Sequence, residues 1–162
     1  MPANGQSYTP VSHVVFDMDG LLLDTEPRYE KAISTVTERY GKPYKLELKV
    51  RVIGTTGRDS ARLITKELEL PITPDQYIAE LDKEYEKVFD NVPFMAGAER
   101  LVRHLHKHQV PIAIATSSKK HTFELKTREL MHVFKLFHHI LIASDDPEIT
   151  RGKPDPQSYQ VT

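Results

Sequence analysis

The chain has 162 residues, of which 39% are hydrophobic, enough for one globular domain or one domain with an insertion. Its 22 basic and 23 acidic side chains nearly balance, which argues against a nucleic-acid or membrane partner recognised through charge. The absence of cysteine excludes disulfides, thiolate zinc sites and a cysteine nucleophile. The polar start does not resemble a signal peptide, and no apolar run approaches the ~20 residues that span a bilayer. We therefore expect a cytoplasmic protein.

Three short apolar runs, each followed by polar residues, predict buried strands. The runs and the residues that follow them are 14–16 with Asp17, 111–115 with Thr116, and 140–143 with Ser144. Helical patterns lie between the runs, which favours parallel strands joined by crossover helices. The fold class is then α/β, with a Rossmann-like parallel sheet. Because such sheets bind ligands at the carboxyl ends of their strands, we expect the polar tips to converge.

The stretch between the first two strands, residues 25–92, is too long for one crossover helix and holds several helical patterns. It predicts an inserted α-helical cap and leaves residues 1–24 and 93–162 for a core with three strands. The clearest helix start in the cap is Thr73-Pro74-Asp75-Gln76, a capping box with proline at the first helical position. The sequence therefore predicts a sheet that carries a helical cap.

One segment of the cap has a different period. Leu46, Leu48, Val50 and Val52 alternate with polar residues, and this period of two favours a strand rather than a helix. The segment lies among helical patterns, so both interpretations stay open. After the cap, residues 97–108 carry apolar side chains at helical spacing and predict a helix that covers the sheet.

The residues after the first strand can carry the chemistry of phosphate ester hydrolysis. This reaction needs a nucleophile, a proton donor for the leaving oxygen and positive charge near the phosphoryl oxygens. Asp17 can attack phosphorus, and Asp19, two residues on in a loop, can shuttle the leaving-group proton. Gly20 lets the backbone turn there. The alternative is a solvated turn or a calcium loop, but the position directly after a buried strand favours catalysis.

Two further groups of polar residues follow the later strands. Thr116 offers a hydroxyl, and the amides of Ser117 and Ser118 lie where a crossover helix should begin, which predicts a phosphate cradle. The alternative is an ordinary helix N-cap. Lys153 stands between a glycine and a proline, so the backbone restrains it on both sides. A loop lysine is usually solvated, whereas one held in this way is a candidate for neutralising phosphoryl charge.

These motifs resemble those of the haloacid dehalogenase superfamily. The similarity lies in residues 16–26, in the strand that ends at Thr116, and in residues 152–156, with a helical cap after the first motif. Within the superfamily, the chain is most similar to the pseudouridine-5'-phosphatase group. The resemblance implies a magnesium-dependent phosphomonoesterase that acts on a small phosphorylated metabolite, such as the nucleotide-like pseudouridine 5'-phosphate, through an aspartyl-phosphate on Asp17.

The resemblance also implies a role for each motif residue. Asp17 is the nucleophile and a magnesium ligand, and Asp19 is the acid/base whose carbonyl also binds magnesium. Thr116 contacts the phosphoryl group, and Lys153 orients the carboxylates. A cap loop that ends at Arg58 faces the site in similar proteins. The candidate substrate-binding residues are Gly20, Ser117, Ser118 and Arg58.

One part of the family pattern does not appear in this sequence. The family has a fourth motif, an acidic pair on another strand beyond the lysine, and residues 154–162 leave no room for it. We therefore expect an incomplete core with weakened magnesium binding. Residues 14–16 would form an apolar sheet edge that can pair with another chain. The alternative hypothesis is a truncated isoform of low or no activity that self-associates through this edge.

Overall fold

The computed structural model describes residues 11–162 and contains one parallel sheet with the strand order β1-β2-β3. The strands are β1 (Val14–Phe16), β2 (Ile112–Thr116) and β3 (His139–Ile142). Val15 lies opposite Ala113, and Ile114 lies opposite Ile140. All three predicted strands are present to within one residue at each end, and their parallel arrangement is confirmed. Their carboxyl ends therefore lie at the same edge of the sheet.

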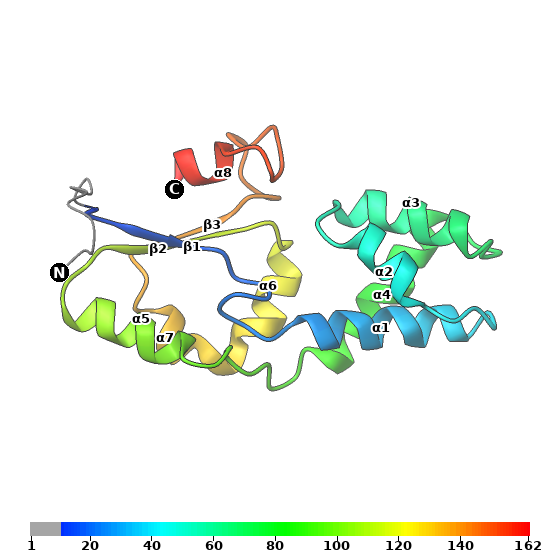
Figure 1. Ribbon diagram of the computed structural model, residues 1–162, viewed down its shortest axis with the longest axis horizontal. Coiled ribbons are helices and arrows are strands. Elements are labelled where there is room, and N and C mark those ends of the chain that lie inside the picture. Colours follow the sequence, from blue (N-terminus) through cyan, green and yellow to red (C-terminus); the bar gives the residue numbers. More distant parts are fainter. Residues whose placement is uncertain (1–10) are drawn as a thin grey trace, which may run out of the picture.

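Helices cover both faces of this sheet. Figure 1 shows α5 and α7 on one face of the sheet and α8 on the other. The central strand β2 is apolar and almost fully buried because helices pack on both of its sides. The helical elements of this part are α5 (Ala98–Lys107), α6 (Lys120–Thr127), the 3-10 turn η1 (Arg128–Leu130), α7 (Met131–Phe134) and α8 (Gln157–Val161).

The remaining helices form a separate group beside the sheet, with an apolar cluster of their own (Figure 1). Fully buried Val36, Ile64 and Tyr77 belong to this cluster. No helix within residues 11–162 is both long and apolar enough to cross a membrane. The helices of the group are α1 (Glu26–Glu38), α2 (Leu46–Val52), α3 (Gly57–Glu67) and α4 (Pro74–Val88).

Residues 46–52 form the helix α2, so the strand favoured by their alternating pattern is wrong. Leu48 and Val52 are buried, whereas Leu46 and Val50 are 69% and 64% exposed. Side chains four residues apart share one face of a helix, so Leu48 and Val52 point into the apolar cluster together. Packing of this pair into the cluster outweighs the local period of two.

The capping box at the start of α4 is confirmed. Thr73 Oγ1 accepts a hydrogen bond from the Gln76 amide at 3.2 Å, and Gln76 Oε1 accepts one from the Thr73 amide at 2.8 Å. Pro74 occupies the first helical position, where a missing N–H has no cost. These contacts satisfy two amides that the helix itself leaves unpaired.

Two chain segments connect the sheet to the group of helices, and they lie side by side. The Asp24 amide donates to the Pro93 carbonyl at 3.0 Å, and the Met95 amide donates to the Leu22 carbonyl at 2.9 Å. Both segments are close to the end of β1, because α1 begins only nine residues after Asp17. The connection therefore places α1 and α4 next to the carboxyl edge of the sheet.

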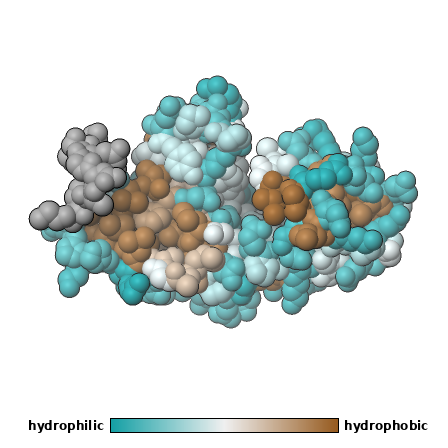
Figure 2. All heavy atoms as spheres, viewed as in Figure 1, coloured by the Kyte–Doolittle hydropathy of each residue, from teal (hydrophilic) through white to brown (hydrophobic). Residues whose placement is uncertain are grey.

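β1 is an edge strand within the part of the chain that the structure describes, as the sequence predicted. Figure 2 shows apolar side chains gathered on this face of the molecule, over β1 and α5. A groove of about 540 Å³ lies there, lined by residues that include Phe16, Leu21, Leu22 and Leu101. Pairing of this edge with another chain stays a prediction.

Candidate active site

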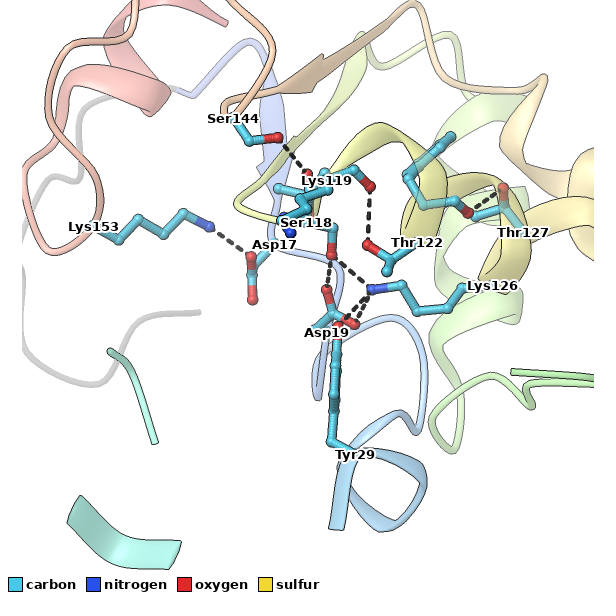
Figure 3. Close-up of polar contacts among 12 residues, drawn as sticks. Asp17, Asp19, Tyr29, Ser118, Lys119, Thr122, Lys126, Thr127, Ser144 and Lys153 are labelled. Carbon is cyan, nitrogen blue, oxygen red and sulfur yellow. Dashed lines mark hydrogen bonds and ion pairs between the residues drawn. The ribbon is translucent and has the colours of Figure 1, made fainter. Parts of the chain in front are cut away.

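Asp17 directly follows β1, and its carboxylate is paired with an ammonium from the other end of the described chain. Lys153 Nζ donates to Asp17 Oδ1 at 2.5 Å and to the Ala115 carbonyl at 2.9 Å. Ala115 immediately precedes Thr116, the last residue of β2. Lys153 thus joins the tips of two neighbouring strands, as Figure 3 shows for its contact with Asp17. The predicted convergence is present for Asp17 and Lys153, and Thr116 is the next residue after Ala115 at the same strand tip.

The environment of Lys153 favours its charged form. Burial is the largest single effect and disfavours the charge, but the interactions with Asp17 and Tyr159 together outweigh it, so the pKa of Lys153 is raised. Its Nζ also lies 4.8 Å from the centre of the Tyr159 ring, a distance at which an aromatic face attracts a cation. The strand tips therefore hold a permanent positive charge at neutral pH, where a phosphoryl group could be neutralised.

Thr116 and Ser118 belong to one hydrogen-bonded turn after β2. The Ser118 amide donates to Thr116 Oγ1 at 3.1 Å, and Ser144 Oγ after β3 donates to the Ser118 carbonyl at 3.1 Å. The helix α6 starts at Lys120, so Ser117 and Ser118 lie in the loop just before it, close to the predicted position. The turn therefore links the tips of β2 and β3.

Asp19 is held by residues from two other segments (Figure 3). Its Oδ2 accepts from Ser118 Oγ at 2.6 Å, and its Oδ1 accepts from Lys126 Nζ at 2.7 Å. Lys126 lies on α6, and its side chain is completely buried. Burial lowers the pKa of Lys126, and the charge of Asp19 counteracts this effect.

The sequence analysis did not identify Lys126. The only signal in the sequence is its spacing, because Lys126 follows the buried Phe123 by three residues and so shares its helix face. A lysine on the inner face of a helix is rarely buried without a charged partner. That partner, Asp19, is 107 residues away in the sequence, so no local pattern indicates it.

A cavity of about 320 Å³ lies between the strand tips and the helices α1 to α4. This volume suits a small metabolite. Asp19, Ser117 and Ser118 line it from the strand tips. From the helices, its lining includes Tyr29, Glu30, Tyr44 and Lys49.

Gly20 and Arg58 are the remaining candidate residues. Gly20 has a φ of +72°, a left-handed conformation that favours glycine, and it lies in the turn beside Asp19. Arg58 lies 3.6 Å from Asp75, and its side chain is 68% exposed. Arg58 is not among the residues that line the cavity, although its neighbour Gly57 is. The structure therefore brings Gly20 near the site, and contact of Arg58 with a substrate stays a prediction.

The donor set at the strand tips can be compared with what magnesium requires. Within residues 11–162, no three or more His, Asp or Glu side chains form a group that could hold a metal. Magnesium is usually bound through one or two carboxylates, with water and substrate phosphate supplying the other oxygens. Asp17 supplies one carboxylate, and the family resemblance implies the Asp19 carbonyl as a second oxygen. These residues fit a magnesium site that depends on substrate or water for most of its ligands.

Comparison with known proteins places this geometry in a family. The chain is 43% identical over 151 residues to the Drosophila melanogaster protein named "Probable pseudouridine-5'-phosphatase", an alignment that covers 93% of this chain and 65% of that protein. It is 38% identical to the (DL)-glycerol-3-phosphatase 1, mitochondrial, of Arabidopsis thaliana, with 92% of this chain and 50% of that protein covered. The chain thus spans about half to two thirds of the length of these relatives.

A solved structure agrees with the fold. The HAD hydrolase, family IA, variant 3, of Entamoeba histolytica has a TM-score of 0.73 at 23% identity, and the match covers 93% of this chain and 68% of that one. The family model described as haloacid dehalogenase-like hydrolase matches residues 14–162, nearly all of the part that the structure describes. Its match includes Asp17, Thr116 and Lys153. The chain therefore belongs to the haloacid dehalogenase-like hydrolases.

Proposed function

We propose that this chain is a magnesium-dependent phosphomonoesterase that acts on a small phosphorylated metabolite. One observation carries the proposal, the ion pair of Asp17 and Lys153 at the tips of β1 and β2. A carboxylate in this position is available as a nucleophile, and the adjacent ammonium offsets the charge of an approaching phosphate. Asp19, two residues from Asp17, lines the cavity where the leaving group would lie.

The proposed reaction has two steps. An Asp17 oxygen attacks phosphorus, the bond from phosphorus to the ester oxygen breaks, and Asp19 gives its proton to that oxygen. Water then attacks the aspartyl-phosphate, Asp19 takes the proton from this water, and phosphate leaves. Lys153, the Thr116 hydroxyl and the Ser117 amide stabilise the phosphoryl oxygens, whereas the Ser118 amide is already bonded to Thr116 Oγ1. Magnesium, held by Asp17 and the Asp19 carbonyl, would neutralise further charge on the transferred group.

The substrate class rests on the cavity and on the relatives. We propose that residues 25–92 act as a cap over residues 1–24 and 93–162 and that the cap selects the leaving group. The aromatic rings of Tyr29 and Tyr44, together with the charged Lys49, suit an organic group with a flat ring and several polar atoms. A nucleotide-like monophosphate such as pseudouridine 5'-phosphate has this chemistry, in agreement with the name of the Drosophila relative.

The proposal is tested by phosphate release from pseudouridine 5'-phosphate and from p-nitrophenyl phosphate, each with magnesium and with a chelator. We expect turnover that requires magnesium and that falls by about 10³-fold or more in Asp17→Asn. Asp145→Asn, a carboxylate variant after β3, serves as the matched control and should keep its activity. Full activity of Asp17→Asn would refute the mechanism. Absence of turnover in the unmodified chain, together with association that rises with concentration, would instead support a role through the β1 edge.

A further inference from the structure

The side chain of Lys126 is completely buried, and each of its three N–H donors has an acceptor. Its Nζ donates to Asp19 Oδ1 at 2.7 Å, to Ser118 Oγ at 2.6 Å and to the Tyr29 hydroxyl at 3.1 Å. A protonated lysine has three N–H donors, so these three acceptors complete its coordination. Figure 3 shows these contacts converging on Nζ at the side of the site opposite Lys153.

Contacts of the same group fix the orientation of the Asp19 carboxylate, because each of its two oxygens accepts a hydrogen bond. Lys126 holds its Oδ1, and the Ser118 hydroxyl, which itself accepts from Lys126, holds its Oδ2. Lys126, Ser118 and Asp19 thus form a closed ring of three hydrogen bonds. The Asp19 side chain keeps 22% of its surface exposed and lines the cavity, so its carboxylate stays accessible to a bound ester.

Aromatic side chains shield these three hydrogen bonds from water. Lys126 Nζ lies 5.4 Å from the ring centres of both Tyr29 and Phe89. Tyr29 lies on α1, and Phe89 follows the last residue of α4, so the helices beside the sheet help to enclose the ammonium. Electrostatic attraction is stronger where water is excluded, which makes the pair with Asp19 rigid.

A purely structural role does not explain a buried lysine at this position. A buried ion pair is often no more stabilising than apolar side chains of similar volume, because both charges lose their hydration. An apolar residue would therefore anchor α6 equally well. What an apolar residue cannot do is hold a carboxylate that lines the cavity.

We infer that Lys126 is a positioning residue, which fixes the Asp19 carboxylate in the orientation for proton transfer to the leaving group. The inference rests on the proposed function and adds to it a residue outside the strand-tip motifs. Lys126 acts through Asp19 and does not itself touch the substrate.

A leaving-group comparison tests this role. Protonation matters for an alkyl phosphate such as glycerol 3-phosphate, whereas p-nitrophenolate departs without a proton. The readout is kcat/KM, which reports only the steps up to formation of the aspartyl-phosphate, so the later hydrolysis that both esters share does not enter. In Lys126→Met we expect kcat/KM for the alkyl ester to fall about 100-fold and kcat/KM for p-nitrophenyl phosphate to fall less than about 5-fold, because only the alkyl leaving group needs general acid catalysis. Ser118→Ala removes the hydroxyl that donates to Asp19 Oδ2. This variant should also slow the alkyl ester more than p-nitrophenyl phosphate, by a smaller factor than Lys126→Met. Equal losses on both esters would overturn the inference.

Controls separate this outcome from misfolding and from failure of the proposed function. Lys135→Met removes an exposed lysine and should leave both rates unchanged. Crystal structures of the unmodified chain and of Lys126→Met provide a readout without turnover. We expect the Asp19 carboxylate to rotate or to occupy more than one orientation in the variant. An unchanged Asp19 would refute the positioning role even if the chain hydrolysed neither ester.

Discussion

Lys153 Nζ lies 2.5 Å from Asp17 Oδ1, although 136 positions separate the two residues in the sequence. The same ammonium holds the Ala115 carbonyl at 2.9 Å, so it reaches the ends of two strands at once. Asp17 would otherwise be a lone carboxylate that repels a phosphate dianion. In the proposed function, the pair is therefore the electrostatic condition for bringing that substrate to Asp17.

Removal of this ammonium should reduce catalysis more than stability. In Lys153→Met we expect kcat to fall by about 10² to 10³-fold, the loss that follows deletion of one fixed donor to a transition-state oxygen. Steady-state kinetics and a thermal melt of the same sample measure both quantities. Arg151→Met, a change of an exposed cation in the same loop, is the matched control and should keep its activity. A Lys153→Met variant as active as the unmodified chain would contradict the assignment.

Magnesium should stabilise the folded chain through Asp17. A ligand that binds only the folded state at about 100 times its dissociation constant adds about 2.7 kcal/mol to the free energy of unfolding. We therefore expect the melting temperature to rise when magnesium is added and to fall back to its metal-free value when a chelator is added. Asp17→Asn should abolish most of the rise, whereas Asp145→Asn should not. If Asp145→Asn removes the effect instead, the metal is bound after β3.

The capping box at the start of α4 should contribute measurably to stability. In Thr73→Ala the Gln76 amide loses its acceptor, and we expect the free energy of unfolding to fall by about 1 kcal/mol. Thr73→Ser keeps the hydroxyl and should retain most of that stability. Urea denaturation of the two variants beside the unmodified chain measures the difference, and equal midpoints for all three would show that the contact is not formed in solution.

Tyr44, which lines the cavity, should make stability depend on pH in alkaline solution. Burial, aided by Glu30 and Glu26, raises the pKa of Tyr44 from 10.0 to about 12. The folded chain then keeps this proton at a pH where the unfolded chain loses it. The contribution of Tyr44 to stability is full below pH 10.0 and decreases as pH rises towards about 12. Tyrosinate absorbance, compared between the unmodified chain and Tyr44→Phe, locates this step, and a Tyr44 step near pH 10.0 would contradict the burial.

The sequence predicted the parts of the structure that depend on local pattern. The strand ending at Phe16 is a continuous apolar run, and the start of α4 follows from Thr73 and Gln76, which lie three residues apart. Local pattern did not predict helix α2, because the alternation of apolar and polar residues there favoured a strand. The burial of Leu48 and Val52 in the cluster of α1, α3 and α4 decides its form, and this packing is not visible in the local pattern of residues 46–52.

The residues of the candidate site also differ in whether local pattern predicts them. Asp17, Thr116 and Lys153 could be predicted because each follows a strand, and parallel strands end at one edge of a sheet. Lys126 could not be predicted, since its importance depends on a contact with Asp19 across 107 positions. Position on a strand tip is visible in a sequence, whereas a buried partner on a crossover helix becomes visible only in three dimensions.

The long separation of Asp17 and Lys153 also concerns synthesis of the chain. A ribosome adds about 5 to 20 residues per second, so Lys153 is made on the order of 10 s after Asp17. During that interval the nascent polypeptide presents Asp17 without its counter-ion. The ion pair therefore forms only once translation has passed Lys153 and its loop has folded back onto the earlier strands.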